Sequence, residues 1–195
     1  MLPLGLLAMA GMILAAYKLT HGPNLARIAA ATGLPLQYVQ LADKEARKNG
    51  LPLEWVIATI LVESRGKPNA RGDADGRSVG LMQVNVVAHA KDMAAAGVTP
   101  AQMLNPATNI EWGTRLMAEF KQQVLAAIAG RSPPAALDEL TRLAYKGPTT
   151  VENVLRKGGN PLTSLSWAPQ AIANWRQAIA TVRTATGPQT IRVFS

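Results

Sequence analysis

The chain has 195 residues, 48% of them hydrophobic, which is long enough for one domain with its own core. Lysine and arginine outnumber the acids and give a formal net charge of +8, but the basic residues are scattered and match no nucleic-acid-binding motif, so we expect a different anionic partner. With no cysteine and two histidines in no ligand pattern, the chain lacks the parts of a thiol peptidase or a zinc hydrolase, so any hydrolytic chemistry should depend on carboxylates, without cofactor or metal.

The chain begins with an uncharged, mostly apolar run over residues 1–17. This is about the minimum length that crosses the hydrocarbon core of a membrane as a helix, so we expect residues 1–20 to be a membrane anchor and residues 21–195 to be the folded domain. The A-x-A-like sequence at Ala8 to Ala10 leaves a cleaved signal peptide open, and a buried core helix is the third alternative. The basic residues that follow the run would place the folded domain on the cytoplasmic side by the positive-inside rule.

Three helices are expected next. Asn24 is a candidate N-cap and Gly33 a candidate stop for the first, and the second ends before Gly50 with basic residues in its last turn. The third begins at Pro52 and is nearly all apolar through Val62. A helix that is apolar around most of its circumference is buried, so we expect this one to be the central helix.

Glycine and proline divide the rest of the chain into further helices. The expected helical segments are 84–97, 99–130 with starts at Thr99-Pro100 and Asn105-Pro106, 132–147 with Ser132 as cap, and 170–187. Residues 156–169 are expected to form a loop. No alternating pattern is convincing apart from a small hairpin in the glycine-rich stretch and a short tail at 189–195, so the fold class is mainly α.

Glu63 stands at the end of the apolar central helix, where a lone glutamate is usually a solvated helix end. Apolar neighbours such as Ile60 and Leu61 would partly desolvate its carboxyl and favour the protonated form that a general acid needs. The following "GDADGRSVG" adds the carboxylates Asp73 and Asp75 on glycines that let backbone approach a ligand. An ordinary surface turn remains an alternative, whereas a calcium loop would require more acidic ligands than this stretch offers.

Four motifs in order carry a resemblance to a known family. They are "ES" at Glu63-Ser64, "GLMQVN" at Gly80 to Asn85, "NPATNIEWGTRLM" at Asn105 to Met117 and "AYKGP" at Ala144 to Pro148. Together they resemble the lytic transglycosylase and goose-type lysozyme superfamily, over about Leu36 to Val182. The resemblance implies a lysozyme-like α+β fold, that is, a helical muralytic domain with a small hairpin. It also implies cleavage of the β-1,4 bond between N-acetylmuramic acid and N-acetylglucosamine in peptidoglycan.

Carried over by position, the resemblance makes Glu63 the general acid and Tyr145 the tyrosine whose hydroxyl lies near the catalytic carboxylate. Lys146 stands where the family pattern has asparagine, so substrate positioning by that amide is in question. Tyr145 and Lys146 are expected to bind the substrate, and so are Ser64, Ser78, Met82, Gln83 and Asn85. Met82 and Tyr145 are equally compatible with packing in the core, and Asn109 and Gly113 indicate helix packing rather than chemistry.

Two reactions begin with the same acid step. A hydrolase needs a placed water, which Asp73 or Asp75 would hold, whereas a lytic transglycosylase uses the C6 hydroxyl of the sugar and needs one carboxylate. Asn85 stands where the goose-type pattern has a second aspartate, which favours the transglycosylase. A goose-type lysozyme and a non-catalytic glycan-binding membrane or virion protein remain the alternatives.

The expected partners follow from this reading. They are peptidoglycan glycan strands, a membrane bound through the N-terminal segment, and phage virion or secretion-system proteins. We expect the protein to be membrane-anchored and to act at the periplasmic cell wall, where it would open the wall locally when a phage enters or lyses its host. This location requires that the positive-inside rule be overridden, or that the membrane have another history, such as that of a virion.

Overall fold

The computed structural model describes residues 24–72, 75–129 and 136–186, and this part of the chain is mainly helical. The helices are α2 (Leu25–Thr32), α3 (Leu36–Lys48), α4 (Leu53–Ser64), α5 (Ala90–Ala95), α6 (Pro106–Ala127), α7 (Leu137–Lys146), α8 (Pro148–Arg156), α9 (Pro161–Ser164) and α10 (Ala168–Thr186), with a short 3-10 helix η1 (Gln102–Leu104). The predicted mainly α class is therefore confirmed. The anchor predicted at residues 1–20 and the predicted cap Ser132 lie outside the described residues, and no helix within them is both long and apolar enough to span a membrane.

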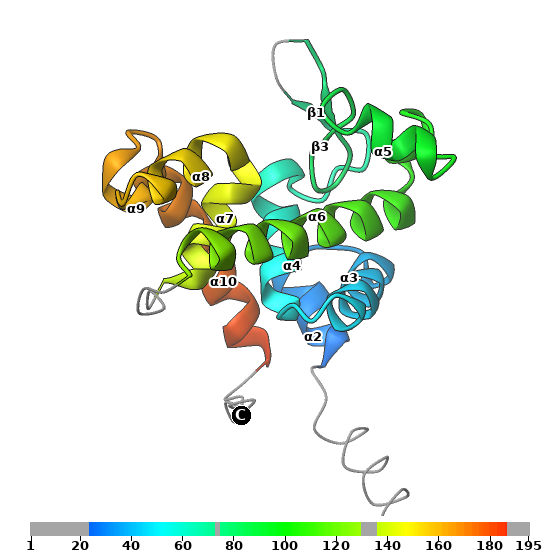
Figure 1. Ribbon diagram of the computed structural model, residues 1–195. Coiled ribbons are helices and arrows are strands. Elements are labelled where there is room, and N and C mark those ends of the chain that lie inside the picture. The colour runs from blue at the N-terminus through cyan, green and yellow to red at the C-terminus, as the bar shows by residue number, and fades with distance from the viewer. Residues whose placement is uncertain (1–23, 73–74, 130–135, 187–195) are drawn as a thin grey trace, which may run out of the picture.

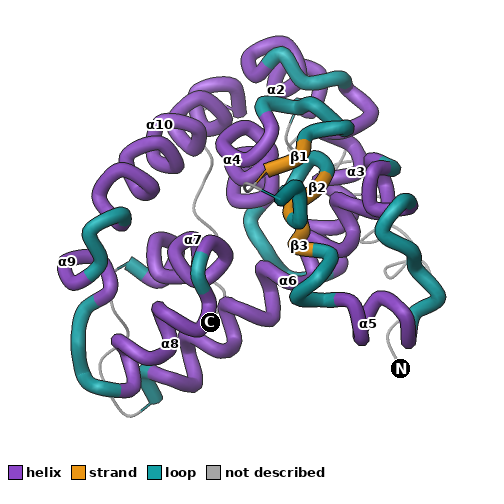
Figure 2. Tube along the Cα trace, turned by 90° about the horizontal axis from the view of Figure 1, so that it is seen from above, coloured by secondary structure: helices purple, strands orange, loops and turns teal. Residues whose placement is uncertain are grey.

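A small antiparallel sheet forms in the glycine-rich stretch. Its strands β1 (Arg71–Gly72), β2 (Ser78–Val79) and β3 (Val84–Asn85) lie in the order β1-β2-β3. Gly72 pairs with Ser78, and Val79 pairs with Val84. The predicted hairpin is thus present and gains a third strand from the segment that was expected to begin a helix. Figure 1 shows the sheet and α5 together above α6, and Figure 2 shows the strands beside α4 and away from α8 and α9.

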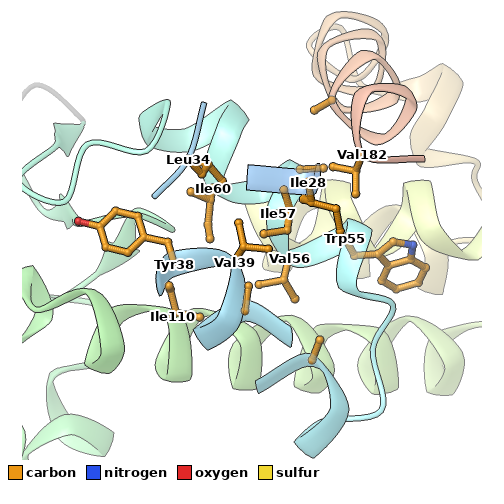
Figure 3. Packing of buried hydrophobic residues seen from close by; sticks show 14 of the residues in the cluster. Ile28, Leu34, Tyr38, Val39, Trp55, Val56, Ile57, Ile60, Ile110 and Val182 are labelled. Atoms are coloured by element: carbon orange, nitrogen blue, oxygen red, sulfur yellow. The ribbon is translucent and has the colours of Figure 1, made fainter. Parts of the chain in front are cut away.

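Helix α4 is the central helix that its apolar sequence predicts. Val56, Ile57 and Ile60 are fully buried, and α10, α3 and α2 surround them (Figure 3). Trp55 of α4 meets Trp175 of α10 edge to face, with ring centroids 6.1 Å apart. This packing fixes the position of the helix and of the residues in its last turn.

Helix α6 runs across the molecule from the sheet to α7 and α8 (Figure 1). It begins at the predicted Asn105-Pro106 start, where the Asn105 side chain accepts hydrogen bonds from the N–H groups of Ala107 and Thr108. The expected loop over 156–169 is partly wrong, because α9 lies inside it. The side chain of Asn160 caps α9 by accepting from the Leu162 N–H at 3.0 Å.

Candidate active site

Glu63 lies in the last turn of α4, one residue before the helix ends. The apolar face of α4 is buried in the core, but the Glu63 side chain is 20% exposed, so it can reach solvent or a ligand. A carboxylate in the last turn faces the negative end of the helix dipole, which disfavours its charge. A compensating cation is therefore expected close to it.

Arg142 of α7 supplies that cation. Its Nη2 lies 2.6 Å from Oε1 of Glu63, and its side chain is only 2% exposed. Its guanidinium carbon lies 6.0 Å from the centre of the Tyr145 ring, at the edge of cation–π range. The result is an ion pair between a partly exposed carboxylate and a buried guanidinium.

Tyr145 lies on the same face of α7 as Arg142, three residues later. Its hydroxyl donates a hydrogen bond to the main-chain oxygen of Met82 at 2.9 Å. Burial raises the pKa of Tyr145, the negative charge of Glu63 raises it further, and Arg142 lowers it. The hydroxyl is therefore protonated at neutral pH and acts as a donor.

Two residues of α6 hold the loop that contains Met82. Asn109 is fully buried; its Oδ1 accepts from the Met82 N–H at 2.7 Å, and its Nδ2 donates to the main-chain oxygens of Val79 and Met103 at 2.9 Å each. One turn later, Gly113 leaves room for this loop, because a Cβ there would lie 2.6 Å from the Met82 sulfur. The motif residues of α6 thus position the loop.

The structure brings Glu63 and Tyr145 together around Arg142 and joins Tyr145 to the Met82 main chain, but several other predicted site residues make their contacts elsewhere. Ser64 is buried, donates to the Ile60 oxygen and accepts from the Gly66 N–H, so its hydroxyl caps α4. The amide of Gln83 donates to the oxygens of Ala70 and Gly80, within the hairpin. Asn85 accepts from the N–H groups of Val87 and Ala88 in the turn after β3.

The remaining predicted residues are spread over the hairpin, the core and the surface. Asp75 is exposed and forms an ion pair with Arg77, whereas Asp73 lies outside the described residues. Ser78 is a part-buried residue of β2. The side chain of Met82 is fully buried, with its sulfur 3.8 Å from the Thr114 hydroxyl, and Lys146 is exposed at the end of α7. In the described part of the chain, no group of three or more His, Cys, Asp or Glu could hold a metal ion.

A model of the transglycosylase SLT domain matches residues 40–162. The chain belongs to this family. The matched segment contains Glu63, the hairpin, Asn109, Arg142 and Tyr145, which are the residues that the fold assembles. Membership in the SLT family supports peptidoglycan lytic transglycosylase activity in general, that is, cleavage of glycosidic bonds with peptidoglycan as substrate. No curated protein matches the chain.

Arg142 is the site residue that the sequence reading missed. The only signal was a basic residue three positions before Tyr145 in a predicted helix, between Leu140 and Leu143. Such a residue is usually solvent-exposed, and only the packing of α7 shows that this one is buried against Glu63.

Proposed function

We propose that this SLT-family chain is a lytic transglycosylase in which Glu63 acts first as general acid and then as general base. The proposed bond is the β-1,4 linkage between N-acetylmuramic acid and N-acetylglucosamine. The observation that carries the proposal is the position of Glu63, a partly exposed carboxylate at the end of a buried helix, beside a buried cation and a neutral tyrosine.

In the first step the protonated Glu63 gives its proton to the glycosidic oxygen, and the bond from that oxygen to the anomeric carbon of the muramic residue breaks. The N-acetyl group of the same sugar assists at the anomeric carbon. The C6 hydroxyl then attacks that carbon and transfers its proton to the Glu63 carboxylate. The enzyme returns to its starting state, water is not consumed, and the muramic residue leaves as a 1,6-anhydro sugar.

The contacts of the other polar residues favour this reaction over hydrolysis. A hydrolase needs a water held by a second carboxylate or other base. Asp75 is paired with Arg77, and the Asn85 amide oxygen is occupied by two backbone N–H groups. A goose-type lysozyme in which Asp73 or Asp75 holds water is the alternative, and the products separate the two: mass spectrometry should find 1,6-anhydro muropeptides, whereas reducing-end muropeptides alone would indicate hydrolysis.

The role of Glu63 is tested by Glu63→Gln, which keeps the shape of the side chain but cannot donate the proton. We expect kcat on purified peptidoglycan to fall by about 10²–10⁴-fold, the usual contribution of general acid–base catalysis. Glu54→Gln is the matched control, because Glu54 lies in the first turn of the same helix and pairs with Arg183 instead. Equal clearing of a peptidoglycan zymogram by wild type and Glu63→Gln would remove Glu63 from the mechanism, and no clearing by either would favour a glycan-binding module.

The cellular setting is a separate part of the proposal. The uncharged run over residues 1–17 supports attachment to a membrane, with the enzyme acting at the periplasmic wall during phage entry into, or lysis of, the host cell. Peptides of this chain in purified phage particles would support a virion-associated role. Recovery of the enzyme only from the membrane fraction of uninfected bacteria would indicate a housekeeping role instead.

A further inference from the structure

Arg142 is more deeply buried than an ion pair of purely structural value would require. Its side chain is 2% exposed, whereas Arg176 of α10, which pairs with Glu139 of α7, is 67% exposed. Burying a guanidinium removes it from water at a free-energy cost, and buried ion pairs are often no more stabilising than apolar residues of similar volume. Stability alone therefore does not explain why α7 carries an arginine here.

The hydrogen bonding of Arg142 leads to the same conclusion. Its Nε and Nη1 are buried and have no hydrogen-bond partner among the described residues, so its contact with Glu63 is made through Nη2. A guanidinium offers five donors, and leaving buried donors unsatisfied is destabilising. An arrangement of this cost points to a function at the carboxylate that Arg142 contacts.

The reaction gives that contact a use. Glu63 alternates between a protonated acid and a carboxylate, and in the carboxylate state it faces the negative end of the α4 dipole. Among the described residues, the charged or titratable groups that interact with it are Arg142 and Tyr145, both from α7, and Tyr145 stays neutral because burial raises its pKa. Within this set, Arg142 is the group that can stabilise the carboxylate between the two proton transfers.

We propose that Arg142 is a positioning residue, whose guanidinium orients the Glu63 carboxylate for both proton transfers and stabilises its charge between them. The inference rests on the proposed role of Glu63.

The test compares kcat and KM on a soluble glycan fragment for wild type, Arg142→Met and Arg142→Lys. The kcat of Arg142→Met should fall while KM stays within about twofold of wild type, because a side chain that is 2% exposed has little surface with which to touch the substrate. The Arg142→Lys variant keeps the charge without the guanidinium geometry, so its kcat should lie between those of wild type and Arg142→Met.

The Arg176→Met variant is the matched control, because it breaks another arginine–glutamate pair, between α10 and α7, and its kcat and KM should equal those of wild type. A folded Arg142→Met with wild-type kcat would overturn the inference. If that variant does not fold, wild-type kcat in Arg142→Lys would overturn the positioning role. Failure of the proposed function gives a different result from failure of this inference. If Glu63 is not the general acid, Glu63→Gln keeps its activity, whatever the Arg142 variants do.

Discussion

Replacing Asn109 by alanine tests how the loop with the Met82 main chain is held against α6. The buried amide of Asn109 accepts one hydrogen bond, from the Met82 N–H, and donates two, to the main-chain oxygens of Val79 and Met103. An alanine leaves these three backbone groups without their partner. Among the described residues, no other side chain forms a hydrogen bond with these three backbone groups.

The expected loss can be estimated from those groups. Each buried donor or acceptor left unsatisfied costs about 1–3 kcal/mol, so Asn109→Ala should lose about 3–5 kcal/mol if water reaches part of the gap. A domain of this size is stable by about 5–15 kcal/mol, so the variant should be close to unfolding under mild conditions. Asn153→Ala is the matched control, because Asn153 is an exposed residue of α8 and its replacement should change stability by no more than about 0.5 kcal/mol.

Urea unfolding followed by far-UV circular dichroism measures both variants against wild type, and peptidoglycan turnover measures the effect on the site. We expect Asn109→Ala to lose activity at temperatures where it is still folded, because the Met82 oxygen also anchors Tyr145. Free energies of unfolding that differ by less than about 1 kcal/mol between Asn109→Ala and Asn153→Ala would refute this reasoning, since even one unsatisfied buried group should cost that much.

Two further substitutions probe the same contacts. Gly113→Ala should lower the free energy of unfolding by about 1–3 kcal/mol through overpacking, and the melting temperature with it, because the new Cβ would lie 2.6 Å from the Met82 sulfur and 2.9 Å from the Tyr145 hydroxyl. Helix propensity alone predicts that alanine stabilises the helix, so a higher melting temperature would contradict the packing. Tyr145→Phe removes the hydrogen bond to the Met82 oxygen and should reduce both stability and turnover. Because burial raises the pKa of Tyr145, its contribution to wild-type stability should be complete below about pH 10, where unfolded tyrosine ionises, and should decline above it by up to about 1.4 kcal/mol per pH unit. Tyr145→Phe lacks this contribution, so denaturant unfolding from pH 9 to 11 should show a smaller decline than in wild type, and parallel curves would contradict the assignment.

The helices could be predicted wherever a capping residue and an apolar period coincide. Asn24 and Gly33 were expected to bound a helix, and the structure has α2 from Leu25 to Thr32, with Asn24 accepting from the Arg27 N–H. The reading failed for α9, although Asn160-Pro161 is the same start signal as Asn105-Pro106. A helix of four residues has too little apolar period to distinguish it from a loop, so only the cap could have revealed it.

The site could be predicted only as far as motifs name single residues. Glu63 and Tyr145 were predicted because each occupies a motif position, and in the fold both lie beside Arg142. Neither the contact of Arg142 with Glu63 nor the hydrogen bonds by which Asn109 holds the Met82 loop could be predicted in this way. Both depend on which helix faces which, and residue spacing along one helix does not contain that information.

The main chain of Met82 explains why these contacts act together. Its N–H is held by Asn109 from α6, and its oxygen is held by Tyr145 from α7, so one residue links the two helices. The Tyr145 ring in turn lies against the guanidinium that holds Glu63. A change at Asn109 should therefore reach Glu63 through Met82 and α7, so in a double-mutant cycle the effects of Asn109→Ala and Arg142→Lys on kcat should not be additive. Additive effects within about 0.3 kcal/mol would show instead that the loop and the ion pair act independently.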